Sequence, residues 1–302
     1  MRARVQVTGF SGAVIVAHDG RPLFRAAYGL ADQTFDIPNT PETKFRLGSV
    51  TKPFTAAAIL LLETRGQLRL SDPVSRYIPN WPTGWAGVTL HHLLTHTAGL
   101  PRLTIAWPLT DVSGLSRSVL PPMPASVIDL ATPAERLQPL NCAPGESFAY
   151  SNIGYVVLGE VIERISGQSH AHFMRENIFL PLGMVHTAAE DPTTIERQLA
   201  RGYARVDNQL TEAGYVDLRL VGGAGALFST VDDLLRFDRA ISTGRLLPAS
   251  VQQRMFTPER AEYAYGWWVE TRFDRRVQWH RGNVQGVVSI TVRYPDDRLF
   301  LA

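Results

Sequence analysis

The sequence is poor in cysteine and in uninterrupted hydrophobic stretches. Cys142 is the only cysteine among 302 residues, so no disulfide can form within the chain. No apolar run approaches the ~18 residues that a membrane-spanning helix needs. Residues 1–10 contain two arginines but no hydrophobic stretch typical of a signal peptide. We therefore expect a cytoplasmic protein without a membrane span, and a periplasmic or secreted location stays open if the N-terminus is truncated.

Charge is also sparse and balanced. Charged residues make up 19% of the chain, and the formal net charge is only +2. Nucleic acids and anionic membranes are usually bound by strongly basic surfaces, so this composition argues against both as partners. With 45% hydrophobic residues, the chain is long enough to bury a sizeable core. One large domain or two interleaved subdomains would fit this length.

Lysine is almost absent, and its position is informative. Only Lys44 and Lys52 are lysines among 30 basic residues. Arginine cannot act as a base because its pKa stays above ~12, whereas the pKa of a buried lysine shifts readily. Lys52 follows Ser49 by three residues, which places both on one face of a helix. A desolvated lysine can take the proton of a serine nucleophile. The same spacing can also arise by chance.

The hydrophobic pattern predicts an α+β fold with strands at both ends of the chain and helices between them. We expect one domain, 1–302, with an antiparallel sheet part at about 1–75 and 215–302 and a mainly helical part at about 76–214. Residues 101–145 are rich in proline and are predicted to form a long lid, with one short helix near 133–137. The expected strands are 10–17, 21–30, 263–273, 276–280, 285–294 and 298–302; the expected helices are 49–66, 89–98, 151–166, 170–179, 191–201, 230–244 and 248–256; and 222–226 is expected to be a loop.

Two further short motifs carry chemical groups. Tyr150-Ser151-Asn152 directly precedes an expected helix, where a phenol near a buried ammonium could have its pKa lowered and relay protons. It could equally be an ordinary loop aromatic followed by an N-cap serine. His280-Arg281-Gly282-Asn283 lies between two expected strands. Gly282 could let a ligand approach the backbone, or the four residues could be a simple hairpin turn.

Together these three motifs resemble those of the serine β-lactamase and penicillin-binding-protein superfamily. Ser49-Val-Thr-Lys52, Tyr150-Ser-Asn152 and His280-Arg-Gly282 match its Ser-x-x-Lys, Tyr-x-Asn and Lys/His-x-Gly patterns in order and spacing. The resemblance runs from about Phe10 to the end of the chain. It is closest to the class C β-lactamase-like branch, which also holds esterases and D-amino-acid-directed peptidases. It implies a β-lactamase/transpeptidase-like fold.

The resemblance also implies a mechanism and a set of site residues. Ser49 would form an acyl-enzyme, and Lys52 and Tyr150 would share the proton transfers. The backbone N–H groups of Ser49 and Asn283, beside Gly282, would form the oxyanion hole. Asn152 would position Lys52 or the substrate amide, and His280 would border the substrate. Water completes the hydrolysis, so no cofactor or metal is implied.

Two departures from the family pattern affect the predicted function. His280 replaces the lysine that attracts a substrate carboxylate in most β-lactamases, which favours an esterase or peptidase over a β-lactamase. We expect a carboxylesterase first, a D-amino-acid-directed peptidase or penicillin-binding protein second, and a β-lactamase third. A slowly acylated sensor or binding module is the alternative from another class. The family usually closes its sheet with a helix at each terminus, and we expect none within these residues; either the sequence is truncated or something else covers that sheet face. An incompletely covered sheet would favour a homo-oligomer.

Three histidines in a short stretch raise the alternative of a metal site. His92 and His96 are four residues apart, and His91 is adjacent. No glutamate stands in the His-Glu-x-x-His pattern, and no carboxylate lies nearby as a third ligand. We therefore expect these histidines to cap or pack a helix and predict no metal.

Overall fold

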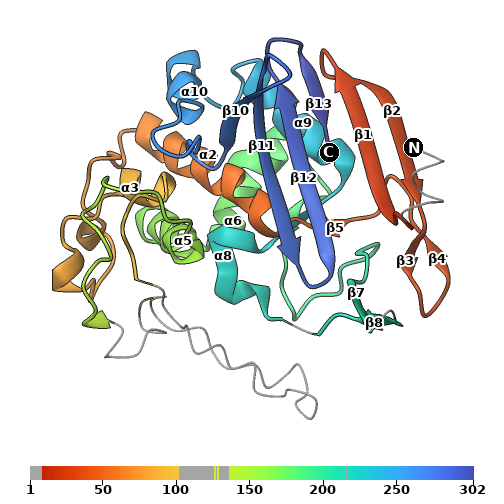
Figure 1. Ribbon diagram of the computed structural model, residues 1–302, viewed down its shortest axis with the longest axis horizontal. Helices are drawn as coiled ribbons and strands as arrows, with labels where there is room; N and C mark the ends of the chain where they lie inside the picture. Colours follow the sequence, from red (N-terminus) through yellow and green to blue (C-terminus); the bar gives the residue numbers. More distant parts are fainter. Residues whose placement is uncertain (1–8, 102–125, 127, 129–135, 208, 215) are drawn as a thin grey trace.

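The computed structural model describes residues 9–101, 126, 128, 136–207, 209–214 and 216–302 (Figure 1). Its largest sheet has six antiparallel strands in the order β10-β11-β12-β13-β1-β2. Two strands come from the start of the chain and four from its end, which confirms the predicted sheet. The strands are β1 (Gly12–His18), β2 (Arg21–Tyr28), β10 (Trp268–Arg272), β11 (Arg275–Val284), β12 (Val287–Tyr294) and β13 (Leu299–Leu301).

Shorter strands connect this sheet to the helical part of the chain. β5 and β6 both pair with β9, and this small sheet places the segment before Ser49 next to the segment after α8. Most of the expected lid, and most of the short helix expected near 133–137, lies outside the described residues. The short strands are β3 (Leu30–Asp32), β4 (Ile37–Pro38), β5 (Phe45–Arg46), β6 (Ala188–Ala189), β7 (Tyr203–Val206), β8 (Gln209–Glu212) and β9 (Leu227–Ser229).

The described helices lie beside and behind the large sheet in the view of Figure 1. None of them is long and apolar enough to cross a bilayer. They are α2 (Thr51–Thr64), α3 (Leu90–Leu94), α5 (Asn152–Ser166), α6 (His170–Met174), α7 (Leu180–Leu182), α8 (Gly222–Gly225), α9 (Val231–Ser242) and α10 (Ala249–Met255), with short helical turns η1 (Gly48–Val50), η2 (Val74–Arg76), η3 (Thr83–Trp85), η6 (Arg175–Phe179) and η7 (Leu218–Val221).

Helix α2 is buried nearly all round, as its almost wholly apolar sequence predicts. Ala56, Ala58 and Leu60 are fully inaccessible to solvent. The helix ends where glycine was expected, because Gly66 adopts a φ of +72° and its N–H bonds the carbonyl of Glu63 at 2.8 Å. A helix fixed on every side is a rigid support for the residues at its N-terminus.

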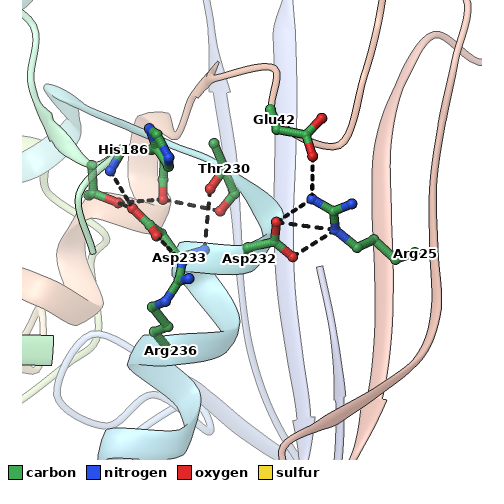
Figure 2. Close-up of polar contacts among 9 residues, drawn as sticks. Arg25, Glu42, His186, Thr230, Asp232, Asp233 and Arg236 are labelled. Atoms are coloured by element: carbon green, nitrogen blue, oxygen red, sulfur yellow. Dashed lines mark hydrogen bonds and ion pairs between the residues drawn. The ribbon is translucent and has the colours of Figure 1, made fainter. Parts of the chain in front are cut away.

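Helix α9 is tied to the sheet and to the small sheet by polar contacts at its first turn (Figure 2). Thr230 caps the helix by accepting the N–H of Asp233, as the capping pattern predicts. The fully buried Asp233 carboxylate accepts the His186 N–H and the Thr187 hydroxyl, both at 2.8 Å. Arg25 of β2 donates to Asp232 at 2.6 Å and to Glu42 at 2.7 Å. These contacts fix the helix against the inner face of the sheet.

The outer face of the large sheet is partly open. Strand residues alternate between faces, so Val288 and Ile290 project away from the helices, and they are 58% and 44% exposed. No described helix covers this face in Figure 1.

Three expectations from the sequence are wrong. Residues 191–201 form turns and not a helix, because their turn-forming start (Asp191-Pro192) outweighs a weak helical pattern. The segment expected as a loop contains the short helix α8, whose glycines allow it to pack tightly on α5. The residues His280 to Asn283 are not a hairpin turn, because β11 continues to Val284 and the turn falls at Gln285-Gly286.

Candidate active site

Ser49 and Lys52 lie at the junction of η1 and α2. Ser49 is in the short turn η1, and Lys52 is the second residue of α2. The Lys52 ammonium nitrogen, Nζ, is 3.1 Å from the Ser49 hydroxyl oxygen. Lys52 is completely buried. The i, i+3 geometry expected from the sequence thus brings a buried amine into hydrogen-bonding contact with a serine.

Lys52 has two other partners, and both are acceptors only. Its Nζ donates to Asn152 Oδ1 at 2.8 Å and to the carbonyl of Ala224 at 2.9 Å. A neutral amine has two hydrogens and one lone pair. With its two hydrogens bound by these oxygens, the lone pair of neutral Lys52 faces Ser49. This arrangement is the one a general base needs.

Burial also makes the neutral form of Lys52 accessible. Desolvation lowers the pKa of Lys52 from 10.5 to about 7. The neutral amine is therefore accessible near neutral pH. Asn152 and Ala224 orient the amine without adding a negative charge that would hold its proton.

Tyr150 differs from what the sequence predicts. Its ring centroid is 4.9 Å from Lys52 Nζ. Tyr150 is 40% exposed, but partial desolvation still raises the pKa of its hydroxyl to about 12, although a hydrogen bond with Ser49 acts in the opposite direction. The expectation of a lowered phenol pKa is therefore wrong, because loss of solvation of the phenolate outweighs its neighbours. Tyr150 is a neutral proton donor near Ser49, and Lys52 is the stronger candidate base.

His96 contacts the segment that contains Tyr150 and Ser151. It is buried, and its Nδ1 accepts the N–H of Ser151 at 3.2 Å. Its ring lies 4.3 Å from the ring of Tyr150 and 4.7 Å from that of Tyr263, centroid to centroid. Burial, followed by the charges of Lys52 and His280, lowers the pKa of His96 well below its usual value. The imidazole is therefore a neutral packing group here.

The neighbouring histidines also have structural partners. His92 completes the capping box of α3 with Thr89. His91 Nε2 lies 2.5 Å from a carboxylate oxygen of Glu259, and its Nδ1 is hydrogen-bonded to the Tyr265 hydroxyl at 2.9 Å. Within the described residues, no three His, Cys, Asp or Glu side chains are grouped so as to hold a metal ion. His92 caps a helix, His91 has polar partners, and His96 packs among aromatic rings while its Nε2 has no hydrogen-bond partner among the described residues.

His280 is a buried, neutral residue on the inner face of β11. Its Nδ1 is 2.9 Å from the carbonyl of Arg281, so Nδ1 carries the proton. Its Nε2 then accepts from the hydroxyl of Tyr263 at 3.2 Å. Burial, and next the charge of Lys52, lowers the pKa of His280 to about 3. His280 therefore offers no positive charge to a substrate carboxylate.

Gly282 allows two parts of the chain to approach each other closely. A Cβ atom at Gly282 would lie 1.8 Å from the carbonyl oxygen of Leu47. Ser289 on the paired strand donates to the same carbonyl at 2.6 Å. Leu47 directly precedes η1, so this contact sets the position of Ser49 relative to β11.

Asn283 lies next to the residue that precedes the serine. Gly48 has a φ of +49°, and a Cβ atom there would be 3.0 Å from the backbone nitrogen of Asn283. The backbone of η1 and that of β11 therefore run side by side at Ser49. Two backbone N–H groups from these elements, those of Ser49 and Asn283, are the candidates for stabilising an oxyanion.

Sequence reasoning missed the role of α8. Ala224 supplies a backbone carbonyl to Lys52, and Gly223 supplies one to the Thr55 hydroxyl at 2.7 Å. Backbone carbonyls leave no signature in side-chain chemistry. The run Gly222-Gly-Ala-Gly225 was the only available signal, since glycine marks a close approach of backbones.

Comparison with known proteins places this geometry in a family. A family model described as Beta-lactamase matches residues 1–302. Penicillin-binding protein 4* of Bacillus subtilis (strain 168) is 33% identical over 309 residues, which cover 96% of this chain and 66% of that protein. Esterase EstB of Burkholderia gladioli is 33% identical over 291 residues, which cover 86% of this chain and 72% of that protein.

The fold comparison agrees. The octameric penicillin-binding protein homologue from Pyrococcus abyssi superposes with a TM-score of 0.82 at 26% identity, covering 99% of this chain and 70% of that one. This chain spans just under two thirds of the length of the Bacillus protein. Because the family model matches from the first residue to the last, the chain belongs to the Beta-lactamase family, and both a penicillin-binding protein and an esterase are among its relatives.

Proposed function

We propose that this chain is a serine hydrolase that forms an acyl-enzyme at Ser49 and acts mainly on carboxylic esters. One observation carries the proposal. Lys52 is buried, has a pKa of about 7, lies 3.1 Å from the Ser49 hydroxyl and has its other two contacts with acceptors only. Such an amine can take the serine proton at neutral pH.

In the proposed acylation, Ser49 Oγ attacks the ester carbonyl and Lys52 takes its proton. The carbonyl oxygen becomes an oxyanion between the N–H groups of Ser49 and Asn283. As the bond from carbon to the alcohol oxygen breaks, Tyr150 gives its proton to the departing alkoxide and receives one from Lys52. The products of this step are a free alcohol and acyl-Ser49.

Deacylation reverses the roles with water. A water molecule attacks the acyl carbonyl, and the Lys52–Tyr150 pair takes its proton. Collapse of the second oxyanion breaks the bond to Ser49 Oγ, which regains a proton from the same pair. The released product is the carboxylic acid, and the side chains return to their starting state.

The neutral state of His280 supports an ester preference. The imidazole is buried and bound by Arg281 and Tyr263, so it cannot pair with an anionic substrate group. Arg281, the next residue on the strand, projects to the opposite face. An uncharged acyl ester makes no demand for a cation at this position. The 33% identity to Esterase EstB is consistent with this choice.

A second candidate is a D-amino-acid-directed peptidase, penicillin-binding protein or β-lactamase. It is favoured by the 33% identity to penicillin-binding protein 4*. Side-by-side turnover of a nitrophenyl ester, a D-alanyl amide and a cephalosporin separates these activities. Ester turnover well above the other two would support our choice, and faster D-alanyl amide or cephalosporin turnover would overturn it.

Labelling tests the chemistry itself. A fluorophosphonate should label the wild-type chain once and the Ser49→Ala variant not at all. Labelling that persists in Ser49→Ala would show that another residue is the nucleophile. A burst of one product per chain without further turnover would instead identify a slowly acylated sensor or binding module.

The proposal extends to assembly. Val288 and Ile290 are exposed on the outer sheet face, and exposed apolar patches favour association. The Pyrococcus abyssi relative is described as octameric. We expect copies of this chain to associate through this face. Light scattering over a range of concentrations measures it, and a monomer at every concentration would contradict it.

A further inference from the structure

His96 binds the residues on both sides of Tyr150. Its carbonyl accepts the N–H of Ala149 at 2.8 Å, and its Nδ1 accepts the N–H of Ser151 at 3.2 Å. Its ring lies against the Tyr150 ring, with 4.3 Å between the two centroids. One residue thus holds the backbone before and after Tyr150 and also contacts its side chain.

The imidazole of His96 is itself held on several sides. It is only 2% exposed, and the ring centroids of Tyr155 and Tyr263 lie 5.0 and 4.7 Å from its own. Tyr155 is fixed in turn, because it is fully buried in α5 and its hydroxyl donates to the carbonyl of Leu94 at 2.8 Å. Close packing leaves such a ring little room to rotate, so Nδ1 keeps its direction toward Ser151.

Two unfavourable features meet at His96. Its φ is +57°, in the left-handed region that residues other than glycine seldom adopt. Because Nδ1 accepts a hydrogen bond, the proton of the neutral ring is on Nε2, and Nε2 has no hydrogen-bond partner among the described residues. Both features cost free energy. A residue persists in such a state only where its surroundings impose it, and such positions cluster at functional sites.

Tyr150 depends on outside support because its own side chain is only partly enclosed. The side chain is 40% exposed, and its hydroxyl is hydrogen-bonded to Ser49. In the proposed acylation this hydroxyl must reach the departing alkoxide. A displacement of about 1 Å can cost about a hundredfold in rate. The two backbone contacts with His96 fix where the Tyr150 side chain starts, and the ring contact limits how it turns.

We propose that His96 is a positioning residue that aims the Tyr150 hydroxyl at the leaving group of the substrate. It acts through Tyr150, because it is too deeply buried to touch the substrate itself. The inference rests on the proposed function, since it concerns the step in which Tyr150 gives its proton to the alkoxide. A substrate whose leaving group needs that proton should depend on His96 more than one whose leaving group does not.

Two esters of the same acid distinguish positioning from a general structural role. 4-Nitrophenyl butyrate releases a nitrophenolate, a stable anion that can leave without a proton. 4-Nitrobenzyl butyrate has a similar shape but releases a strongly basic alkoxide that needs one. His96→Leu should lower kcat/KM, measured from the released acid, about a hundredfold for the nitrobenzyl ester and no more than about fivefold for the nitrophenyl ester. Equal losses for both esters would overturn the proposal.

His96→Asn is the conservative variant that should restore the behaviour of the wild type. Asparagine tolerates the left-handed backbone, and its Oδ1 is as many bonds from the backbone as Nδ1 of histidine. It can therefore accept the Ser151 N–H, and the ratio of the two kcat/KM values should stay close to that of the wild type. His170→Leu removes an imidazole that is also buried, from α6, and should leave the ratio unchanged. A ratio in His96→Asn as altered as in His96→Leu would refute the role of the acceptor.

A double-mutant cycle shows whether the effect passes through Tyr150. In a Tyr150→Phe background, His96→Leu should no longer change the ratio of the two kcat/KM values, because no phenol hydroxyl remains to be aimed. The competing route runs through Asn152, which follows Ser151 and accepts from Lys52 at 2.8 Å. That route would lower kcat/KM for both esters alike and shift its rise with pH. Such a result would contradict the assignment to Tyr150.

Hydrogen exchange in the Ser49→Ala chain tests the contact without any turnover. His96→Leu should speed exchange of the Ser151 amide about fivefold, which corresponds to one lost hydrogen bond, whereas His96→Asn should not. Unchanged exchange at Ser151 in a folded His96→Leu chain would overturn the inference. If exchange responds as expected but neither ester is turned over, the proposed function fails while the hold of His96 on the Tyr150 segment stands.

Discussion

Lys52 donates a hydrogen bond to the carbonyl of Ala224, 2.9 Å away and 172 residues further along the chain. A carbonyl cannot give a proton back and carries no full charge. It therefore orients the amine without fixing the protonation state. This contact and the one with Asn152 make Lys52 suited to act as a base.

Replacing Lys52 by arginine should nearly abolish activity although the positive charge is kept. Arginine cannot become neutral at accessible pH, so it cannot take the Ser49 proton. We expect kcat/KM for a nitrophenyl ester to fall by about a thousandfold, within the range for losing a general base. Lys44→Arg is the control, because Lys44 forms an ion pair with Glu196 at 3.3 Å and touches none of the site residues. An active Lys52→Arg variant would show that Lys52 acts only through its positive charge.

The rate should rise with pH through about 7. Deprotonation of Lys52 creates the active base, and its pKa is lowered to that value by burial. The pKa of Tyr150 is raised to about 12, so loss of its proton should lower the rate only at very alkaline pH. The pKa of His280 is lowered to about 3, so it adds no further limb near neutrality. The profile of kcat/KM from pH 5 to 10 measures this. A rise delayed until about pH 10 would show that Lys52 keeps the ordinary lysine pKa.

Gly282→Ala should damage both stability and activity. The added Cβ would meet the Leu47 carbonyl at 1.8 Å, so η1 must move away from β11. We expect the free energy of unfolding to fall by about 1–3 kcal/mol, which is typical of overpacking. We expect kcat to fall further than this loss of stability alone would explain. Gly214→Ala, where nothing lies within 4 Å of the added atom, should behave like the wild type. Denaturant titration and ester turnover test the pair, and a neutral Gly282→Ala would refute the close contact.

Two adjacent carboxylates of α9 should differ in their contribution to stability. Asp233 is fully buried and accepts from His186 and Thr187. Asp233→Ala should cost about 3 kcal/mol or more, because these donors lose their partner in the interior. Asp232→Ala should cost about 1 kcal/mol or less, because its pair with Arg25 is partly exposed. Equal losses in denaturant titrations would contradict the difference in burial.

His170 should make the protein less stable as the pH falls. The unfolded imidazole takes a proton near its ordinary pKa of 6.5, whereas the folded one stays neutral until about pH 4. The unfolded state therefore binds more protons between these values, and the unfolding free energy falls with decreasing pH. His170→Phe should reduce the difference in stability between pH 7.5 and 5.0 by about 2 kcal/mol. His172→Phe, on the exposed side of α6, should leave that difference unchanged.

Much of the fold follows from local sequence patterns. The apolar stretch after Lys52 predicts the buried helix α2, and Thr230 with Asp233 predicts the start of α9. The strands at both chain ends predict the shared sheet. The division into a sheet part and a helical part stays a prediction. These features depend on periodicity and capping, which act over a few residues.

The parts that sequence reasoning missed depend on contacts between distant segments. The pKa of Tyr150 is set by burial among other elements, so the motif alone pointed in the wrong direction. Gly282 was read as an opening for a ligand, but its neighbour is the carbonyl of Leu47. Ala224 contributes only its backbone, which no residue pattern reveals. His280 looked like part of a turn because its neighbours include Gly282 and Asn283, whereas pairing with β12 keeps them extended.

The near absence of lysine has a practical consequence for chemical labelling. Apart from the N-terminal amine, the chain offers only the amines of Lys44 and Lys52 to acylating or reductive-methylating reagents. Lys52 has no exposed surface, and Lys44 is engaged with Glu196. A dye or a surface coupled through amines will therefore attach at very few positions. Isotope-labelled methyl groups introduced under mild unfolding would sit on Lys44, Lys52 and the N-terminal amine only. A Lys44→Arg variant would then identify the magnetic-resonance signal that reports the protonation of Lys52.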